Sequence, residues 1–242
     1  SVVIDMGDAA PPLSLRRARG YAPTALPLPV NGDAPGLCVG GELKNTVAVV
    51  RGGRVIVSQH LGDLKHPLAL AYFRKAIDDL CDLFGVEPAW IAHDEHPLYL
   101  STEHARKLAS ERGMSLVGVQ HHHAHAAALL AEHERPGPIL AVVCDGVGYG
   151  PDGTIWGGEL LHCDLHDYRR LAHLRPLHLP GGDAAAKDTR RPALALLAHA
   201  FGGDFADHPA ARRLVSDEEE RAMLAAMIHR DFNCAVSTGC GR

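Results

Sequence analysis

The sequence predicts an α/β protein of two lobes, each of which begins with a three-stranded β-meander. Short apolar runs rich in β-branched residues alternate with Gly-Gly turns, and longer segments place apolar residues at helical spacing. The tetrapeptide Gly-Gly-Glu-Leu occurs at 40–43 and again at 157–160, which suggests a duplicated unit. We therefore divide the chain into an extended segment, a first lobe and a second lobe, at residues 1–36, 37–135 and 136–242.

The first lobe is expected to combine its meander with three helices. Residues 1–36 contain many prolines and no helical period, so they are expected to form an extended tail. The next segments predict strands at 37–43, 45–53, 54–63, 89–94 and 115–120, and helices at 66–85, at 101–113 and from His121 to just before Glu134. The first helix should stop at Gly85, and the second should begin with a Ser/Thr cap.

The second lobe is expected to repeat the meander after Pro138 and then to become helical. The pattern predicts strands at 139–146, 155–165 and 168–179, a turn at 148–154, and helices at 190–203 and 216–230. The final segment, NCAVSTGCGR, stops without a terminator for a core element. We therefore expect this lobe to be incomplete and the chain to be part of a longer protein.

The composition favours a globular cytoplasmic protein. Hydrophobic residues make up 46% of the chain and charged residues 22%. The sequence has no apolar run of the ~18–20 residues that span a bilayer, and no signal-peptide pattern. A net charge of -5 argues against nucleic acid as a partner, and six cysteines without a Cys-x-x-Cys pair argue against a zinc ribbon or a dithiol site.

Four histidines fall within five positions of VQHHHAHAAALL, at 119–130. His121 and His125 are one helical turn apart and share a helix face, whereas His122 and His123 are rotated away from them. Asp145, at the expected end of the strand ILAVVCDG, is the best third ligand. Two imidazoles and a carboxylate suit iron, zinc or manganese. The alternative is that these histidines only cap a helix or hydrogen-bond in a core; their position at a strand-to-helix junction favours the metal.

The segment DGVGYGPDGTIWGGE, at 145–159, is suited to phosphate binding because glycines let the backbone approach an anion closely. The candidate phosphate contacts are Gly146, Gly148, Gly150, Gly157 and Gly158. A hairpin with a Pro-Asp-Gly turn would require glycines as well, so both interpretations stay open.

Several other polar residues are candidates for chemistry. Glu159 and Asp152 could assist a metal or a hydroxyl group, or lie in solvent. Cys144 is expected to be part of the core, because its strand is apolar. The candidate catalytic residues are Lys44 and Glu159, and the candidate phosphate or acyl contacts are Asn45 and Thr46, although any surface hairpin could carry such residues.

The chain resembles the hydrogenase-maturation carbamoyltransferases (HypF) over nearly its whole length, in their C-terminal, threonylcarbamoyl-transferase-like region. The resemblance is carried by the ordered motifs LRRARGYAP, GGELKNT, SQHLGDL, IAHDEHPLYLST, VQHHHAHAAA, DGVGYGPDGTIWGGE, LPGGDAA and STGCGR. It implies an actin/Hsp70-like (ASKHA) nucleotide-binding fold with a metal in the cleft between the lobes.

The resemblance also implies roles for individual residues. It implies that His121, His125 and Asp145 are ligands of a divalent metal, iron or zinc, and that Gly181 and Gly182 of LPGGDAA contact the nucleotide. A further aspartate ligand expected from the family has no counterpart in these 242 residues. Upstream, family members carry acylphosphatase-like, zinc-finger and YrdC-like domains, and LRRARGYAP is similar to the end of the last of these.

The implied reaction transfers a carbamoyl group from carbamoyl adenylate, made upstream from carbamoyl phosphate and ATP, to the C-terminal cysteine of the maturation protein HypE. The product leads to the cyanide ligand of [NiFe]-hydrogenase. Two alternatives remain: an O-carbamoyltransferase that acts on a small-molecule hydroxyl, and a non-catalytic nucleotide-binding module whose histidines are structural. Chelator sensitivity and acceptor preference would distinguish the three.

Overall fold

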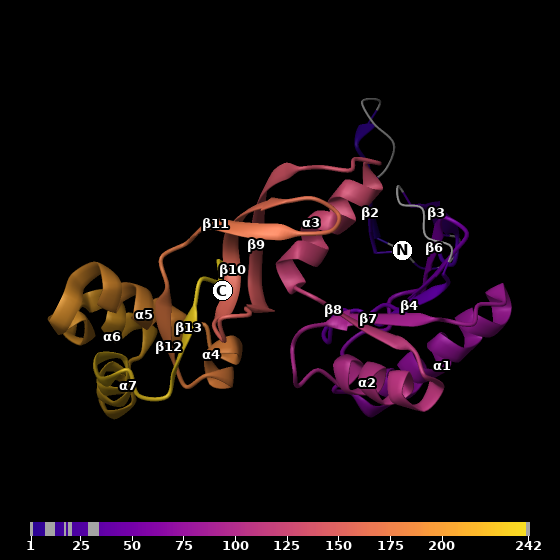
Figure 1. The fold of residues 1–242 in the computed structure, drawn as a ribbon. Helices are drawn as coiled ribbons and strands as arrows, with labels where there is room; N and C mark the ends of the chain where they lie inside the picture. The colour runs from indigo at the N-terminus through magenta and orange to yellow at the C-terminus, as the bar shows by residue number, and fades with distance from the viewer. Residues whose placement is uncertain (1, 8–12, 17, 19–20, 29–33, 241–242) are drawn as a thin grey trace. The chain divides into compact units, whose positions relative to one another are not determined.

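The computed structural model describes residues 2–7, 13–16, 18, 21–28 and 34–240 (Figure 1). Two compact units account for the contacts within the chain, namely Ser1–Gln120 with Leu129–Pro136, and His121–Ala128 with Gly137–Arg242. Both units contain a mixed β-sheet and helices, so the predicted α/β class is confirmed. None of the helices in the described part of the chain is long and apolar enough to cross a membrane.

The N-terminal unit is built on a six-stranded sheet in the order β3-β6-β5-β4-β7-β8. Its strands are β3 (Ala25–Pro27), β4 (Gly36–Cys38), β5 (Ala48–Arg51), β6 (Arg54–Val57), β7 (Trp90–Asp94) and β8 (Ser115–Val119). The first predicted meander is confirmed, because β4, β5 and β6 are consecutive antiparallel neighbours. β7 and β8 then extend the sheet in parallel, which requires the helical crossovers that the sequence supplies.

Helices α1 (Pro67–Phe84) and α2 (Leu100–Arg112) lie against this sheet (Figure 1). α1 ends where Gly85 adopts a left-handed conformation, as predicted. The predicted Ser/Thr cap of α2 is wrong, because Tyr99 occupies the cap position. Thr102 lies within the first turn of α2, and its hydroxyl donates to the Asp94 carbonyl at 2.8 Å. The Thr102 side chain therefore contacts β7 instead of capping the helix.

The apolar face of α1 carries much of the core of this unit. Phe73 is fully buried and belongs to one cluster with Leu37 and Ile77. Phe73→Ala should therefore lower the free energy of unfolding by about 3–5 kcal/mol, because it leaves a cavity in a packed core. Urea unfolding measures this, and Tyr72→Ala is the matched control, since Tyr72 is next in sequence but 56% exposed. An equal loss of unfolding free energy in Phe73→Ala and Tyr72→Ala would contradict the assignment of Phe73 to this core.

The extended tail expected at 1–36 is more ordered than predicted. β1 (Val2–Ile4) pairs with β2 (Leu13–Arg16), and β3 pairs with β6 at the edge of the sheet. A proline is tolerated at such an edge because its missing N–H faces away from the ladder, as at Pro27. The motif LRRARGYAP lies partly outside the described residues.

The C-terminal unit is built on a five-stranded sheet in which β10 pairs with β9, β11 and β13, and β13 pairs with β12. Its strands are β9 (Ile139–Tyr149), β10 (Ile155–Cys163), β11 (Tyr168–His173), β12 (Leu177–Pro180) and β13 (Cys234–Ser237). The second predicted meander is confirmed, because β9, β10 and β11 are consecutive antiparallel neighbours.

Two predictions are corrected by the structure. The single strand expected at 168–179 is divided into β11 and β12, with Pro176 in the break. The final segment, for which no element was predicted, contributes β13 to the sheet. The two Gly-Gly-Glu-Leu copies lie on different elements, since 40–43 connects β4 to β5 whereas 157–160 lies inside β10.

Helices account for the rest of the C-terminal unit. They are the first part (His121–Ala128) of α3 (His121–Glu132), then α4 (Asp183–Lys187), α5 (Arg190–Phe201), the 3₁₀ helix η2 (Gly202–Asp207), α6 (Pro209–Leu214) and α7 (Glu218–Arg230). The predicted helices α5 and α7 are confirmed. They pack with η2 around a small core that includes Leu194, Phe205 and Leu224.

Candidate metal centre

Helix α3 and strand β9 together position the predicted metal ligands. Ala126 of α3 is buried in one cluster with Ala141 and Val143 of β9. Alternate residues of a strand share a face, so Asp145 follows these two residues on the side that meets α3. The packing of small side chains therefore brings the first turn of the helix, where His121 lies, to this carboxylate.

Asp145 was predicted to lie at the end of its strand, but β9 continues to Tyr149. It lies instead at a bulge, where residues 145–147 of β9 face only Gly157 of β10. The regular pairs on either side of the bulge are Cys144 with Gly158 and Gly148 with Trp156. A bulge leaves residues out of the ladder and re-aims their side chains, which explains how a mid-strand aspartate becomes available as a ligand.

Gly157 permits this bulge. A Cβ at this position would lie 2.5 Å from the Asp145 carbonyl oxygen and 2.4 Å from the Gly239 Cα. Any other residue would therefore push β10 away from the bulge. Close approach of three backbone segments thus requires a glycine at this position.

The three predicted ligands converge on one point. One potential ligand atom from each of His121, His125 and Asp145 lies within 4.8 Å of the other two. His121 Nε2 is 3.2 Å from Asp145 Oδ2, and the His121 and His125 rings are 5.0 Å apart. Two imidazoles and one carboxylate are the protein ligands of several catalytic zinc sites and of non-haem iron sites, so this donor set fits a divalent metal.

The surroundings of Asp145 keep its carboxyl group ionised, as cation binding requires. Partial burial raises the pKa of this carboxyl, but hydrogen bonds from His121 and from the Gly146 amide outweigh burial and lower the pKa to about 2. The Gly146 amide donates to Asp145 Oδ1 at 2.6 Å. The carboxylate is therefore ionised at neutral pH, and Oδ2 faces the histidines.

The other two histidines of the cluster have different surroundings. His122 is fully buried beside Trp156, with ring centroids 6.1 Å apart. Burial first, and then the charge of His121, lower the pKa of His122 to about 4, so its ring is neutral at neutral pH. His123 packs against Tyr168, and its Nε2 lies 2.9 Å from the Asp164 carbonyl. As predicted from helical geometry, both are rotated away from the ligand pair.

The predicted phosphate loop is a hairpin. Gly146 and Gly148 lie in β9, Gly157 and Gly158 lie in β10, and the turn is closed by hydrogen bonds from Gly153 to Gly150 and from Gly150 to Thr154. The segment therefore has the hairpin with a Pro-Asp-Gly turn of the alternative interpretation, and phosphate contacts at its glycines stay a prediction.

The tight contacts at these glycines explain why they are glycines. A Cβ on Gly150 would lie 2.2 Å from Trp156 Nε1, and one on Gly158 would lie 2.4 Å from a Leu174 methyl carbon. A Cβ on Gly148 would lie 2.3 Å from His122 Cε1. Glycine at these three positions thus leaves room for the side chains of Trp156, Leu174 and His122.

Glu159 is the centre of a buried network. Its side chain is fully buried; Oε2 accepts from Arg170 Nε at 2.7 Å, and Oε1 accepts from the Gly157 amide and the Thr238 hydroxyl. Burial raises the pKa of Glu159, but these hydrogen bonds outweigh it and lower the pKa. Both carboxylate oxygens of Glu159 therefore bind protein partners and stabilise this part of the sheet, and its catalytic role stays a prediction.

The network extends to the hairpin turn through Arg170. Its guanidinium lies 4.0 Å from the Trp156 ring centroid and 3.2 Å from Asp152 Oδ2. Asp152 in turn accepts from Trp156 Nε1 and from Thr154. Sequence patterns did not identify Arg170, Trp156 or Thr238, because their partners lie on other strands.

Glu159→Gln should destabilise the fold by about 1–3 kcal/mol at neutral pH, since Arg170 loses its buried counter-charge. The folded-state pKa of Glu159 lies below its ordinary value of 4.5, so its charge stabilises the fold above that value and the contribution is lost as the pH falls through the folded pKa. The difference between the two proteins should therefore shrink on acidification. Urea unfolding from neutral pH down to below pH 4.5 measures this difference in the free energy of unfolding, and Glu219→Gln is the control because Glu219 is exposed. A difference that does not change with pH would contradict the stabilising role of the Glu159 charge.

The remaining predicted site residues lie in a loop of the N-terminal unit and in the turn before α4. Lys44, Asn45 and Thr46 belong to the N-terminal unit, where the Asn45 amide is buried and donates to the carbonyls of Val39 and Gly41. Lys44 is exposed. Gly181 and Gly182 form the turn before α4 with positive φ angles, which explains the requirement for glycine there.

The prediction that Cys144 is part of the core is wrong. It is exposed, because alternation along β9 places it on the side opposite Ala141, Val143 and Asp145. An apolar run was misleading here, since β9 buries only one face.

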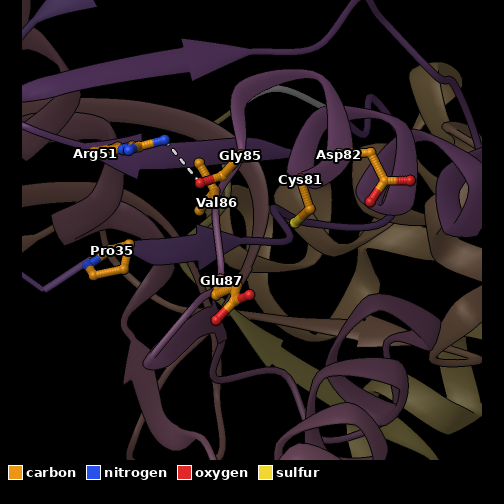
Figure 2. A pocket seen from close by; sticks show the side chains of 7 residues that line it. All are labelled: Pro35, Arg51, Cys81, Asp82, Gly85, Val86 and Glu87. Atoms are coloured by element: carbon orange, nitrogen blue, oxygen red, sulfur yellow. Dashed lines mark hydrogen bonds between the residues drawn. The ribbon is translucent and has the colours of Figure 1, made fainter.

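A separate cavity of about 550 Å³ lies in the N-terminal unit, at the C-terminal end of α1 (Figure 2). It is lined by Pro35, Arg51, Cys81, Asp82, Gly85, Val86 and Glu87. Arg51 donates to the carbonyls of Phe84 and Gly85 and so caps the helix. No residue predicted to have a role in the site lines this cavity.

Comparison with known proteins identifies the family. Residues 31–132 match the model of the HypF Kae1-like domain, and residues 141–242 match that of the second subdomain of the carbamoyltransferase Kae1-like domain. Carbamoyltransferase HypF2 of Cupriavidus necator is 43% identical over 249 aligned residues, which cover 100% of this chain and 29% of the relative. Carbamoyltransferase HypF of Synechocystis is 41% identical, over 93% of this chain and 29% of the relative.

A solved structure agrees with the sequence matches. A crystal structure of full-length HypF in the phosphate- and nucleotide-bound form superposes with a TM-score of 0.85 at 38% identity, over 93% of this chain and 34% of that one. The chain thus spans about a third of the length of the proteins that it matches. The two family models, the relatives and the shared fold together show that the chain belongs to the HypF family of carbamoyltransferases, of which it carries the Kae1-like region.

Proposed function

We propose that this chain is the carbamoyl-transfer part of a hydrogenase-maturation enzyme. In this proposal, a carbamoyl group passes from carbamoyl adenylate, made from carbamoyl phosphate and ATP by an upstream domain, to the C-terminal cysteine of a HypE-like maturation protein. The thiocarboxamide product is the precursor of the cyanide ligand of [NiFe]-hydrogenase. Membership of a family whose relatives are named carbamoyltransferases supports the reaction type.

The observation that carries the proposal is the convergence of His121, His125 and Asp145. We propose that these three residues hold a divalent metal, iron or zinc. Such a metal supplies a Lewis acid for a carbamoyl or phosphate oxygen. The chain's own contribution is to keep Asp145 ionised and to hold His121 in place through packing of α3 on β9.

We further propose that the region has an actin/Hsp70-like fold and uses a nucleotide. A three-stranded antiparallel meander in each unit supports this fold. The phosphate- and nucleotide-bound form of a related HypF supports nucleotide use. Phosphate contacts are proposed at Lys44, Asn45 and Thr46 and at Gly181 and Gly182, which lie outside the regular strands.

Direct transfer tests this function. The chain is mixed with carbamoyl adenylate and with a peptide that ends in cysteine, and the peptide is analysed by mass spectrometry for a thiocarboxamide. A matched peptide ending in serine tests the O-carbamoyltransferase alternative. We expect product on the cysteine peptide only, and we expect a chelator to abolish it.

Variants connect the reaction to the candidate site. His121→Ala combined with His125→Ala should reduce transfer by about 10²-fold or more, the scale for loss of an electrostatic catalytic group. His162→Ala is the matched control, because His162 is exposed on β10. Transfer that persists in the double variant and in chelator would overturn the metal-dependent mechanism, and nucleotide binding without any transfer would favour the non-catalytic alternative.

A further inference from the structure

Two cysteines from distant parts of the sequence meet beside Asp145. Cys144 precedes this aspartate in β9, and Cys240 follows β13 near the end of the described chain. Both residues are exposed, and the Cys240 thiol lies 3.5 Å from the carbonyl oxygen of Asp145, the residue that follows Cys144. The spacing of cysteines along the sequence excluded a Cys-x-x-Cys pair, but it could not exclude a pair brought together by the sheet.

The backbone around Cys240 holds the pair in place. Its amide donates to the Asp145 carbonyl at 3.0 Å, and its thiol lies 3.4 Å from the Gly157 carbonyl and 3.5 Å from the Asp145 carbonyl. The segment is packed tightly here, because a Cβ on Gly239 would lie 2.5 Å from the Gly146 carbonyl oxygen. Cys144 and Cys240 are therefore held close by contacts that do not depend on the thiols themselves.

The other four cysteines of the chain have different surroundings. Cys81 and Cys163 are buried, and burial raises the pKa of Cys38 to about 11. The Cys234 thiol donates to backbone carbonyls of Met227 and Phe232. All six cysteines lie within the described residues 34–240, and of these only Cys144 and Cys240 are exposed.

We propose that Cys144 and Cys240 form a reversible disulfide when the chain meets a low-molecular-weight disulfide such as oxidised glutathione. One protein thiolate attacks oxidised glutathione, which gives a mixed disulfide and releases one glutathione thiolate. The second protein thiolate then attacks the mixed disulfide and releases the second glutathione. Two protein S–H bonds are lost and one S–S bond forms, while two electrons and two protons leave on two reduced glutathione molecules.

The disulfide should alter the candidate metal centre, a consequence that rests on the proposed metal site. In the reduced chain the Cys240 thiol donates to the carbonyl of Asp145. A disulfide sulfur has no proton to donate, and the cross-link needs the two sulfur atoms roughly 2.0 Å apart. The bulge that carries Asp145 must therefore shift, and metal affinity should fall about threefold to tenfold, the range for loss of one hydrogen bond.

Peptide mapping tests the disulfide itself, without reference to metal or activity. The folded chain is incubated with oxidised glutathione, blocked with an alkylating agent, digested and analysed by mass spectrometry. We expect one cross-linked product that joins Cys144 to Cys240, a loss of two hydrogen atoms in the intact mass, and a fall in free thiols from six to four, because two of the six cysteines are consumed. Dithiothreitol should reverse all three changes.

Single variants identify the pair. Cys144→Ser and Cys240→Ser should each stop at a mixed disulfide with glutathione, whereas the matched Cys234→Ser should still form the cross-link. If Cys240→Ser does not fold, Cys144→Ser alone decides the question, because Cys144 is exposed and its replacement leaves the backbone contacts of Gly239 and Cys240 in place. Cross-links that are scattered over other cysteines, or that form only in denaturant, would overturn the proposal.

Manganese binding tests the effect on the metal centre. Mn²⁺ prefers oxygen and nitrogen ligands to thiolates, so a change in its binding reports the histidines and Asp145 rather than the cysteines. We expect weaker Mn²⁺ binding in the oxidised chain and recovery after reduction. Unchanged Mn²⁺ affinity in a fully cross-linked chain would overturn the coupling, whereas a chain that never binds Mn²⁺ in either state would contradict the proposed metal site and leave the mapped disulfide standing.

Discussion

Asp145→Asn should weaken zinc binding by about 10²-fold or more at neutral pH, because the carboxylate is the only charged member of the ligand set. The pKa of Asp145 is lowered to about 2, so the native side chain carries a full negative charge under these conditions. Asparagine keeps the shape and one oxygen but removes the charge. Isothermal titration with Zn²⁺ in the presence of a reductant measures the change.

A matched control separates this effect from a general loss of charge. Asp207→Asn removes an aspartate on the exposed surface, where it pairs with Arg212 at 3.1 Å. This variant should bind Zn²⁺ as the native chain does, because surface pairs contribute little. Equal affinity in the native chain and in Asp145→Asn would show that His121 and His125 bind zinc without this carboxylate, and the proposed centre would be wrong.

Gly148→Ala should both destabilise the C-terminal unit, by about 1–3 kcal/mol, and disturb the metal ligands. The new Cβ would lie 2.3 Å from His122 Cε1 and 3.0 Å from His121 Cδ2. His122 is fully buried and has no space to move into. We therefore expect α3 to move relative to β9, with a lower melting temperature and weaker Zn²⁺ binding, measured by thermal unfolding and by titration.

The cause of this effect can be tested by a double variant. In a His122→Ala background the main clash is absent, so Gly148→Ala should cost less than it does in the native chain. Gly203→Ala is the control for glycine replacement, because a Cβ there meets no atom within 4 Å. If Gly148→Ala changes the melting temperature and Zn²⁺ binding as little as Gly203→Ala does, the close contact of Gly148 with His122 would be contradicted.

Local patterns in the sequence were sufficient for most of the elements. Helical spacing located α1, α5 and α7, and β-branched runs between glycines located both meanders. The i,i+4 spacing of His121 and His125 placed both imidazoles on one face of α3, where the structure brings them near Asp145. These features depend on residues close together in the chain, where spacing determines direction.

Features that depend on strand register were not predicted. The bulge at Asp145, the exposure of Cys144 and the hydrogen bond from the Cys240 amide to the Asp145 carbonyl all follow from how β9, β10 and β13 are aligned. The same holds for Glu159, whose carboxylate is occupied by Arg170 from β11 and by Thr238 from beyond β13. The sequence also could not predict that Gly148 lies against the His122 ring, and the predicted phosphate contacts of the glycine-rich segment stay a prediction.

The sequence by itself determined the α/β class, the two meanders and the pair of histidines on one helical turn. Only the tertiary structure decided that Asp145 reaches that pair from a mid-strand bulge, and that Gly148 and Gly157 provide the space for it. The physical reason is the range of the interactions. Side-chain periodicity is a property of consecutive residues, whereas register, bulges and close backbone contacts arise when distant segments pack against one another.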